Sequence, residues 1–395
     1  MISVEEALAQ VLALAAPVGI EEVALAQSAG RVLARPVTAG RDQPPFDASA
    51  MDGYALDGAA ARPGATLRVI GEAGAGHGFA GRVGPGEAVR IFTGAPLPEG
   101  TDRVIIQEDV TRAGETITLG DIGAATHVRA AGGDFAAGAE ITPPRSLTPS
   151  LLALLAAMNV AHVPVRRRPV VALVPTGDEL VMPGETPRPD QIIASNIFAL
   201  KAIAEAEGAE ARLLPIARDT PESLRGVLAL AEGADMIVTI GGASAGDHDI
   251  VGPVAAELGM ERAFYKVAMR PGKPLMAGRL GAAVLLGLPG NPVSAIVCGY
   301  LFMVPALRAM LGRADPAPPL RAGVLGVDVP ANGPRAHYMR ATLETGDGPA
   351  RITPFERQDS ALLRVLTEAQ ALLLRPAGDA ARRAGDAAQY IALRS

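Results

Sequence analysis

The stretch AVLLGLPGNPVSAIV, residues 283–297, decides the fold of the central part of the chain. It opens with an apolar run, turns at PGNP, and continues as a second apolar run that suits a helix. A strand that is apolar at every position must be covered on both faces, as in a parallel sheet between helices. Residues 169–180 (PVVALVPTGDEL) and 235–249 (DMIVTIGGASAGDHD) repeat the strand and its polar loop. We therefore expect an α/β domain with a doubly wound parallel sheet.

The rest of the chain differs from this central part in its residue pattern. A capping box between Ser3 and Glu6 begins a first helix, and a helical pattern returns at 146–160 (SLTPSLLALLAAMNV). We expect these helical segments to pack together. Glycines alternate with short β-like runs between them, and similar runs follow Pro318, which predicts two β-rich parts. The expected domains are a helical N-terminal and linker domain (1–40 with 141–168), an inserted β-rich domain (41–140), the α/β domain (169–316) and a C-terminal β domain (317–395).

The composition of the 395-residue chain narrows its class. Its net charge is −6, from 36 basic and 42 acidic residues, so no basic surface indicates nucleic-acid binding. Cys298 is the single cysteine, which excludes a disulfide within the chain and fits a reducing cytoplasm. The acidic N-terminus lacks the positive charge of a signal peptide. Pro305 and Arg308 interrupt the apolar run 292–311 before the roughly 20 residues of a membrane span, so we expect a buried helix and no membrane contact.

Polar residues follow three of the expected parallel strands. Ligands bind beyond the carboxyl ends of the strands in such sheets, so these loops are candidates for a site. The glycines of GGASAG and PGNP let backbone N–H groups approach an anion, and a helix N-terminus adds its dipole. Any one loop is as readily an ordinary turn, but three together favour a ligand site. The candidates are Thr176, Asp178, Glu179, Ser244, Asp247, Asp249, Gly290, Asn291, Pro292 and Ser294.

The loop MRPGKP, residues 269–274, adds positive charge. Arg270 and Lys273 lie on a proline-stiffened loop, and Lys266 precedes Arg270 by four residues. Cations on a rigid loop suit a phosphate or another oxyanion. The alternative is a solvated basic loop with no ligand.

The acidic residues have two possible uses. Asp178, Glu179, Asp219, Asp247 and Asp249 could bind a divalent cation through oxygen. One of them could instead accept two parallel hydrogen bonds from a heterocycle with a guanidine-like N–H pair. Asp219 also suits a helix N-cap before Thr-Pro-Glu. The histidines show no metal-ligand spacing, and the chain has no Ser-His-Asp order, Walker A loop or GxGxxG.

Six motifs in a fixed order make the chain resemble the molybdopterin molybdenumtransferases, the molybdenum insertase family that includes the E domain of gephyrin. They are DASAMDGYAL (47–56), TGAPLPEGTDRVIIQED (93–109), VPTGDEL (174–180), GGASAGDHD (241–249), MRPGKP (269–274) and GLPGNPVSA (287–295). The resemblance covers nearly the whole chain. It implies an elongated homodimer of four-domain subunits, with a molybdopterin-binding α/β domain and a C-terminal β barrel. The implied reaction inserts molybdate into adenylated molybdopterin and releases AMP, with Mg²⁺ required.

The resemblance also assigns residues to this site. It implies that Asp52 reaches the α/β domain of a partner subunit and that Thr93 and Asp134 join it. Lys266, Arg270 and Lys273 complete the catalytic set with Glu179 and hold phosphate and molybdate. Asp219 and Asp249 are the implied metal ligands. Molybdate contacts are implied for Arg270, Lys273, Ser294, Arg340 and Ser360. The implied molybdopterin-binding residues are Thr176, Gly177, Asp178, Glu179, Asn196, Gly241, Gly242, Ser244, Asp249, Pro289, Gly290, Asn291, Pro292 and Ser294.

Two departures and three alternatives accompany this interpretation. Arg270 stands where many relatives have lysine, which keeps the charge but changes the contact geometry. The loop GGASAGDHD lacks the Arg-Asp expected of the related molybdopterin adenylyltransferase, which argues that this chain is not that enzyme. We expect the adenylyltransferase instead to be the donor of the substrate. The alternatives are that adenylyltransferase, a molybdopterin-binding scaffold or carrier without turnover, and a tungsten-handling relative.

Overall fold

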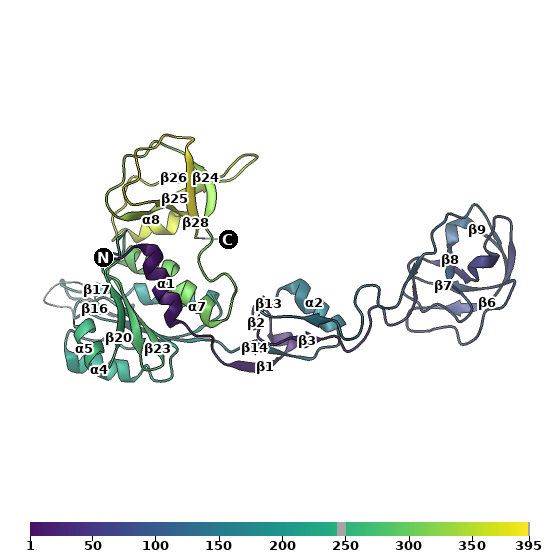
Figure 1. Ribbon diagram of the computed structural model, residues 1–395, viewed down its shortest axis with the longest axis horizontal. Coiled ribbons are helices and arrows are strands. Elements are labelled where there is room, and N and C mark those ends of the chain that lie inside the picture. Colours follow the sequence, from purple (N-terminus) through teal and green to yellow (C-terminus); the bar gives the residue numbers. More distant parts are fainter. Residues whose placement is uncertain (243–249, 394–395) are drawn as a thin grey trace.

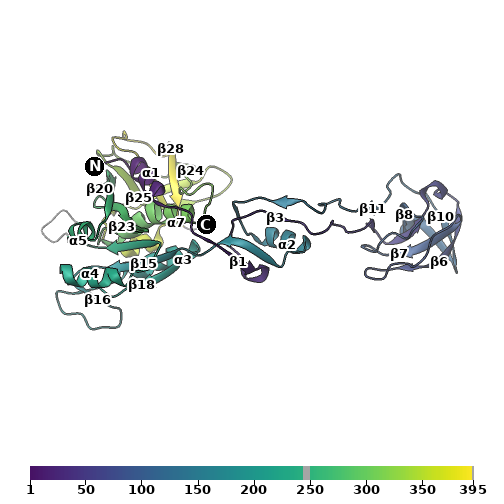
Figure 2. The same cartoon turned by 60° about the horizontal axis from the view of Figure 1, so that its bottom comes forward.

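The computed structural model describes residues 1–242 and 250–393, and the chain in it is elongated (Figure 1). The α/β domain and the C-terminal barrel lie together at one end, and the inserted β domain lies at the other. A narrow segment with a small sheet joins them. The two ends stay apart when the molecule is turned (Figure 2), so residues of the inserted domain and of the α/β domain do not meet within one chain.

The α/β domain is built on a six-stranded sheet. Its order is β18 (Glu210–Leu213), β15 (Val170–Pro175), β19 (Met236–Ile240), β23 (Ala283–Leu288), β22 (Met276–Leu280) and β20 (Glu261–Tyr265). The first four strands are parallel, which confirms the predicted doubly wound α/β fold. β22 pairs antiparallel with β23, and β20 pairs antiparallel with β22, a feature that the sequence did not indicate. Only two residues separate β22 from β23, so these strands form a hairpin.

Helices cover both faces of this sheet. Along β15, Val171 and Leu173 pack on one side, and Ala172 and Val174 pack on the other. The first side is covered by α1 (Val4–Leu14), α3 (Asn196–Ala206), α6 (Pro292–Cys298) and α7 (Val304–Met310). The second side is covered by α4 (Pro221–Ala229) and α5 (Val251–Glu257). This alternation explains why the central strands are apolar at every position.

The apolar run after PGNP is one continuous helical segment. A π-helical stretch, η4 (Gly299–Met303), joins α6 to α7. Residues Pro292–Met310 are long and apolar enough to cross a membrane, but 83% of an 18-residue stretch within them is buried in the protein. The segment therefore has the position of a core helix, as predicted.

The N-terminal and linker part contains less helix than predicted. The capping box of Ser3 and Glu6 begins α1 as expected, but α1 packs on the α/β domain. The second helix, α2 (Pro149–Ala157), instead packs on a four-stranded sheet. The expectation that the two helices pack together was wrong, because the sequence pattern of the short strands between them was missed. One of these strands carries Pro164 in its middle, and a proline weakens the strand pattern. The sheet order is β1 (Ile20–Ala24), β14 (His162–Arg166), β2 (Val32–Leu33) and β13 (Arg145–Ser146).

The inserted domain is a second six-stranded sheet reached by two-stranded ribbons. Its order is β8 (Arg103–Ile106), β5 (Gly53–Leu56), β7 (Glu87–Ile91), β6 (Thr66–Ala73), β10 (Thr116–Leu119) and β9 (Val110–Ala113). The ribbons pair β3 (Val37–Thr38) with β12 (Glu140–Ile141) and β4 (Ala48–Ser49) with β11 (Val128–Arg129). Short 3-10 turns complete the domain: η2 (Gly58–Ala60) and η3 (Gln107–Asp109).

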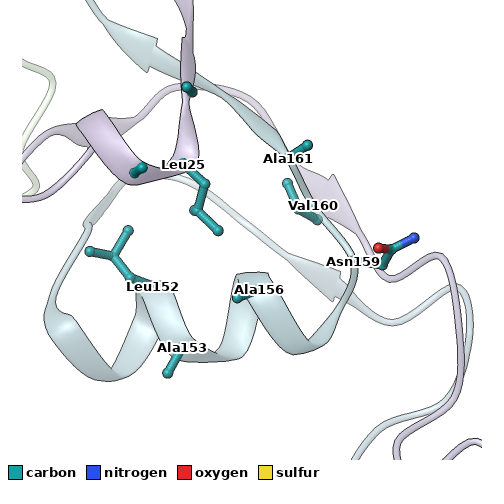
Figure 3. Close-up of a pocket in the computed structure, with 9 residues that line it drawn as sticks. Leu25, Leu152, Ala153, Ala156, Asn159, Val160 and Ala161 are labelled. Carbon is teal, nitrogen blue, oxygen red and sulfur yellow. The ribbon is translucent and has the colours of Figure 1, made fainter.

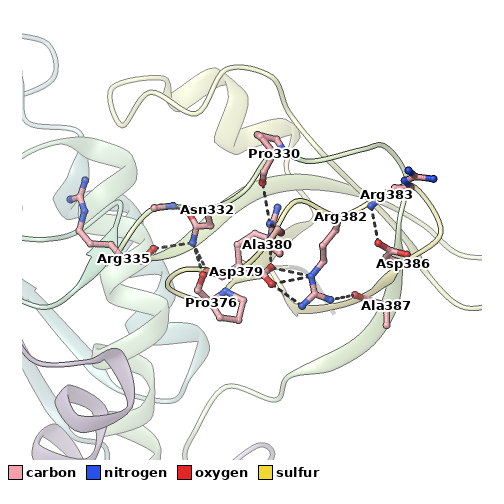
Figure 4. A network of polar contacts seen from close by, with 12 residues as sticks. Pro330, Asn332, Arg335, Pro376, Asp379, Ala380, Arg382, Arg383, Asp386 and Ala387 are labelled. Atoms are coloured by element: carbon pink, nitrogen blue, oxygen red, sulfur yellow. Dashed lines mark hydrogen bonds and ion pairs between the residues drawn. The ribbon is translucent and has the colours of Figure 1, made fainter.

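The C-terminal domain is a closed barrel, as the resemblance implied. Closure follows because β25 pairs with both β26 and β27. Its strands are β24 (Arg321–Leu325), β25 (Ala336–Glu344), β26 (Arg351–Pro354), β27 (Ala371–Arg375) and β28 (Ala387–Ala392), with α8 (Leu363–Glu368) before β27. β21 (Met269–Arg270) adds to β25 in parallel and joins the barrel to the α/β domain. Arg375 and Arg382 both bind the carboxylate of Asp379, and this network closes the loop after β27 (Figure 4).

Candidate functional site

A pocket of about 760 Å³ lies at the carboxyl ends of three parallel strands, β15, β19 and β23. This is the position that the parallel topology favours for a ligand. Ala361, from the loop before α8, lines it as well, so the C-terminal domain contributes to the wall. Ten predicted molybdopterin-binding residues line the pocket: Thr176, Gly177, Glu179, Asn196, Gly241, Gly242, Pro289, Gly290, Asn291 and Pro292. Asp178 and Ser294 lie beside it without lining it.

Two glycines allow the loops around the pocket to adopt their backbone conformation. Gly177 has φ +143°, and a Cβ there would lie 2.3 Å from a carboxylate oxygen of Glu179. Gly241 has φ +98°, and a Cβ there would lie 2.7 Å from the carbonyl oxygen of Thr176. The positive φ disfavours a side chain at both positions, and at Gly241 the backbone carbonyl of Thr176 also leaves no space for one. The strand-end loops therefore approach each other closely enough to share one ligand.

Polar side chains hold these loops together. The amide Nδ2 of Asn196 donates to the carbonyl of Gly290 at 2.7 Å, which ties the start of α3 to the PGNP turn. Nη1 of Arg218 donates to the carbonyls of Asp178 (3.1 Å) and Leu180 (3.0 Å). Sequence reasoning missed Arg218, although it directly precedes Asp219. Its guanidinium fixes the loop that carries Glu179.

The acidic part of the pocket centres on Glu179 and Asp219, which both line it. The backbone N–H of Asp178 donates to Asp219 Oδ2 (3.4 Å), and the N–H of Asp219 donates to Asp178 Oδ1 (3.2 Å). Asp219 is not the cap of α4, because Thr220 accepts the hydrogen bond from the Ser223 N–H. Its carboxylate is therefore available to the pocket.

The structure does not describe three of the predicted residues. Ser244, Asp247 and Asp249 fall outside the described residues. Within residues 1–242 and 250–393, no group of three or more His, Cys, Asp or Glu side chains could hold a metal ion.

The three predicted cations lie on the segment between β20 and β22. Pro274, next to Lys273, lines the pocket. Arg270 and Lys273 are exposed, and the ammonium of Lys266 lies 4.8 Å from the ring centroid of Tyr265. None of the three forms an ion pair with a carboxylate in the described part of the chain. Their charge is thus uncompensated by those residues and suits an anionic ligand.

Arg340 and Ser360 belong to one arrangement in the C-terminal domain. Arg340 is only 1% exposed, and its Nη1 donates to the carbonyl of Asp359 at 2.8 Å. Further bonds from its Nε and Nη2 go to Gln358 Oε1. The carbonyl of Ser360 accepts from the N–H of Val293 at the start of α6 (3.0 Å). Arg340 therefore holds the loop that places Ser360 beside the PGNP turn.

His337 lies among these cations, and sequence reasoning treated it as incidental. It is buried, it pairs with Arg270 across strands β21 and β25, and its Nε2 has no hydrogen-bond partner among the residues that the structure describes. Burial, followed by the charges of Arg270 and Arg340, lowers the pKa of His337 to about 4. The imidazole is therefore neutral near pH 7.

Asp52 and Thr93 form a separate cluster in the inserted domain. Asp52 Oδ1 accepts from the Thr93 N–H (2.8 Å) and from the Thr93 hydroxyl (2.7 Å). These two hydrogen bonds, the backbone one first, lower the pKa of Asp52 below its ordinary value. Asp134 does not join this pair. Its N–H donates to the Gln43 carbonyl (2.9 Å) on the connection between domains.

Apolar residues complete one wall of the pocket. Ile192 and Ile193, on β17 (Ile192–Ile193), line it and are 58% and 38% exposed. Sequence reasoning missed both, because QIIAS offers only a short apolar pair. Two exposed isoleucines beside a polar pocket suit the flat face of a heterocycle.

The other hollows lack this combination. One, between α2 and η1 (Leu25–Gln27), is lined by small apolar residues such as Leu25, Leu152 and Ala156 and by no charged side chain (Figure 3). Another, in the barrel, has Arg375 and Asp379 in its wall, but they already pair with each other. Among these hollows of the described residues, the strand-end pocket has the lining that matches the predicted site.

Three family profiles match the chain: MoeA N-terminal region (domain I and II) over residues 2–159, probable molybdopterin binding domain over 172–309, and MoeA C-terminal region (domain IV) over 322–393. The fold, the pocket and these profiles define the class, a multidomain enzyme of molybdenum cofactor biosynthesis.

Relatives place the chain more closely. A molybdopterin molybdenumtransferase of Nostoc sp. is 37% identical over 81% of this chain and 76% of its own. One of Bacillus subtilis is 33% identical over 95% and 90%, respectively. The crystal structure of a molybdopterin biosynthesis MoeA protein from Pyrococcus horikoshii matches with a TM-score of 0.84 and 30% identity over 100% of both chains. The chain belongs to the molybdopterin molybdenumtransferase family, a family of transferases.

Proposed function

We propose that this transferase inserts molybdate into adenylated molybdopterin in the strand-end pocket and releases AMP. The observation that carries the proposal is the lining of that pocket. It combines backbone N–H groups at glycine turns, a carboxylate pair and an apolar wall, and the segment that carries Pro274 adds cations that pair with no described carboxylate. A phosphate-bearing pterin needs each of these features, for its phosphate, its ring N–H groups, its ring face and the incoming oxyanion, respectively.

Each part of the pocket has a proposed role. Glu179 accepts hydrogen bonds from the heterocycle, which packs on Ile192. Molybdate is a tetrahedral dianion, and Arg270 and Lys273 hold it beside the dithiolene sulfurs. Lys266 shares their charge. Arg340 acts on this site through the loop that carries Ser360, because its own donors are largely used by that loop.

Mg²⁺ is the proposed cofactor, and the residues fit it in part. Magnesium takes one or two protein carboxylates together with substrate phosphate oxygens. Asp219 has one oxygen that accepts a backbone hydrogen bond and a second that faces no such donor in the described residues. Asp219 would hold the ion together with Asp249, and the ion would offset the negative charge of the phosphoanhydride.

The site is proposed to be shared between two subunits of a cytoplasmic homodimer. Asp52 and Thr93 lie in the domain at the far end of the molecule from the pocket (Figure 2). They can act on a ligand in that pocket only if another copy of the chain supplies them. A molybdopterin adenylyltransferase is the expected source of the adenylated substrate.

The test is AMP release by the purified protein. Adenylated molybdopterin and Mg²⁺ are mixed with molybdate, with tungstate or with neither. AMP is measured by chromatography, and cofactor is measured by reconstitution of an apo-molybdoenzyme. We expect AMP release that depends on the oxyanion and yields active cofactor. Tight binding without AMP release would favour the carrier, and consumption of ATP with unmodified molybdopterin would favour the adenylyltransferase. The ratio of the molybdate and tungstate rates ranks the two metals.

A further inference from the structure

The Asp52 cluster has a third participant that none of its motifs indicates. Arg90, on β7, lies beside the strand that begins directly after Asp52. Its Nη1 donates to the carbonyl of Gly53 at 3.0 Å, and its Nη2 donates to Oε1 of Gln107 at 2.6 Å. The guanidinium therefore binds both the residue that follows Asp52 and a residue of η3.

The second of these bonds acts on Asp52 through Gln107. The backbone N–H of Gln107 donates to the carbonyl of Asp52 at 3.1 Å. Gly53 pairs with Ile91 on one neighbouring strand and with Ile106 on the other. Arg90 thus connects the segments on either side of β5 at the residue where that strand meets Asp52.

Aromatic stacking fixes the same guanidinium in place. Its central carbon lies 5.1 Å from the ring centroid of Tyr54 and 4.8 Å from that of Phe92. Phe92 directly precedes Thr93, the residue that donates two hydrogen bonds to Asp52. A planar, delocalised cation suits a position between two rings and two carbonyl-type acceptors, and a lysine ammonium does not.

We propose that Arg90 is the positioning residue of the Asp52 cluster. It ties Gly53, Gln107 and Phe92 together so that Thr93 occupies Oδ1 of Asp52 and Oδ2 stays available to a ligand. Oδ2 has no hydrogen-bond partner in the described part of the chain. This inference rests on the proposed function for one point, the placement of Asp52 at the reaction site.

The charge of Arg90 acts in the same direction. It contributes to the lowered pKa of Asp52, after the hydrogen bonds from Thr93. Arg90 itself forms no ion pair within 4 Å of a described carboxylate. Its charge is therefore available to keep Asp52 ionised rather than being consumed by a salt bridge.

The test compares three variants of the full-length protein in the AMP-release assay. Arg90→Lys keeps the charge but cannot make both hydrogen bonds and both stacking contacts. Arg90→Ala removes the group and leaves space for a small guanidinium ion. Arg68→Gln is the matched control, because Arg68 lies on the neighbouring strand β6 in an exposed ion pair with Glu87.

We expect kcat/KM to fall about tenfold or more in Arg90→Lys and further in Arg90→Ala, because small displacements of a reacting group carry losses of that order. Arg68→Gln keeps the wild-type value. Guanidinium ion, added well below denaturing concentrations, restores part of the activity of Arg90→Ala and none to the control. A purely structural arginine would not give this rescue.

Two outcomes would overturn the inference. One is full activity in Arg90→Lys. The other is a loss in Arg90→Ala that matches the fraction of unfolded protein and that guanidinium does not reverse. Asp52→Asn, measured in parallel, separates this inference from the proposed function. If Asp52→Asn keeps full activity, the placement of Asp52 at the site is wrong; if it is inactive while Arg90→Lys is normal, only the role of Arg90 is wrong.

Discussion

The strand-end pocket and the Asp52 cluster are built in opposite ways. The pocket gathers residues that are far apart in the sequence, from Thr176 to Ala361, at one edge of a sheet. The Asp52–Thr93 pair itself joins only two short segments, which meet where β5 begins and β7 ends. The pocket is enclosed by loops from two domains. Asp52 is only partly covered, at the start of its strand.

The difference shows what each region can do alone. The pocket already offers several polar groups to one ligand, so binding can occur within a single chain. The Asp52 cluster offers one hydrogen-bonded carboxylate and no cavity of its own among the main hollows. An isolated carboxylate gives little affinity by itself, so we expect this cluster to act on a ligand that is held elsewhere.

The largest effect is expected when two inactive variants are mixed. This experiment tests whether the pocket and Asp52 of one site come from different chains. Asp52→Asn and Glu179→Gln should each lower AMP release about 100-fold or more, the usual loss for a group that orients or stabilises the reacting atoms. In a randomly mixed dimer population, half the dimers carry both variants and one of their two sites is intact. Activity should then recover to about one quarter of wild type.

The control is each variant mixed with itself, which regains nothing. Mixed dimers isolated through two different affinity tags should reach about half the wild-type rate, because each has one intact site. Absence of recovery in isolated mixed dimers would mean that each chain uses its own Asp52. The two regions would then have to meet within one subunit, against the separation seen in both views of the molecule.

The close approach of loops in the pocket gives the second prediction. Gly241→Ala should lower stability by about 2–4 kcal/mol, because the new Cβ meets the Thr176 carbonyl at a positive φ. AMP release should fall as well, since this loop lines the pocket. Gly233→Ala is the control: its φ is +78°, but a Cβ there meets nothing within 4 Å. It should lose only about 1–2 kcal/mol, with activity retained.

Both variants are compared by urea unfolding and by the AMP assay. Equal losses in the two would show that backbone conformation alone matters at Gly241. The loops around Gly241 would then be less tightly packed than the distance to the Thr176 carbonyl indicates. The difference in packing between the pocket and the Asp52 cluster would be smaller than described.

The position of the strand-end residues could be predicted from the sequence because the topology determines it. Apolar strands followed by TGDEL and PGNP placed Glu179 and Asn291 correctly at one edge of the sheet. The inserted domain was foreseen as β-rich, but its separation from the pocket follows from the ribbons β3–β12 and β4–β11, whose strands are two residues long. Such short pairings leave no periodic pattern in the sequence.

Side chains that act through the backbone were also missed. Arg218 and Arg90 bind backbone carbonyl groups of neighbouring segments, and nothing in their local sequence separates them from a surface arginine. Asp219 suited a helix cap by its place before Thr-Pro-Glu, but Thr220 takes that role, since only the residue next to Pro221 has the required position. These errors concern three-dimensional partners, which spacing alone does not specify.

Acid should affect the pocket side of the molecule more than the inserted domain. The pKa of His337 is about 4 in the folded chain and 6.5 ordinarily, so between these values the unfolded chain binds a proton that the folded chain does not. Stability therefore falls as pH falls from 6.5 toward 4. At pH 5 the loss relative to pH 7.5 should be about 2 kcal/mol.

The variant His337→Gln should lose less stability over the same pH interval, measured by urea unfolding at both pH values. His77→Gln, at an exposed position in the inserted domain, should behave like the wild type. If His77→Gln resists acid better than His337→Gln, the acid-sensitive group lies in the inserted domain and is not His337. The expected electrostatic difference between the surroundings of His337 and the inserted domain would then be wrong.

The smallest effect is expected from the ion pairs of the two regions. Glu207, in the α/β domain, accepts from Arg308 at 2.6 Å and from Arg313 at 3.0 Å, and its side chain is 16% exposed. Glu99, in the inserted domain, pairs with Arg82 where both side chains are 70% exposed. Glu207→Gln should cost about 1–3 kcal/mol, because two guanidinium groups lose their counter-charge. Glu99→Gln should change stability by less than about 0.5 kcal/mol, because solvent screens the pair.

Urea unfolding of the two variants at low and high salt measures this difference. Glu99→Gln should match the wild type at both salt concentrations and keep its AMP release. A large cost for Glu99→Gln would mean that surface charge stabilises the inserted domain, and effects of Arg90 or Asp52 variants could then arise from folding. If Glu99→Gln changes stability negligibly, the inserted domain is stabilised mainly by its apolar cores. A loss of activity in an Arg90 variant would then report on the position of Asp52.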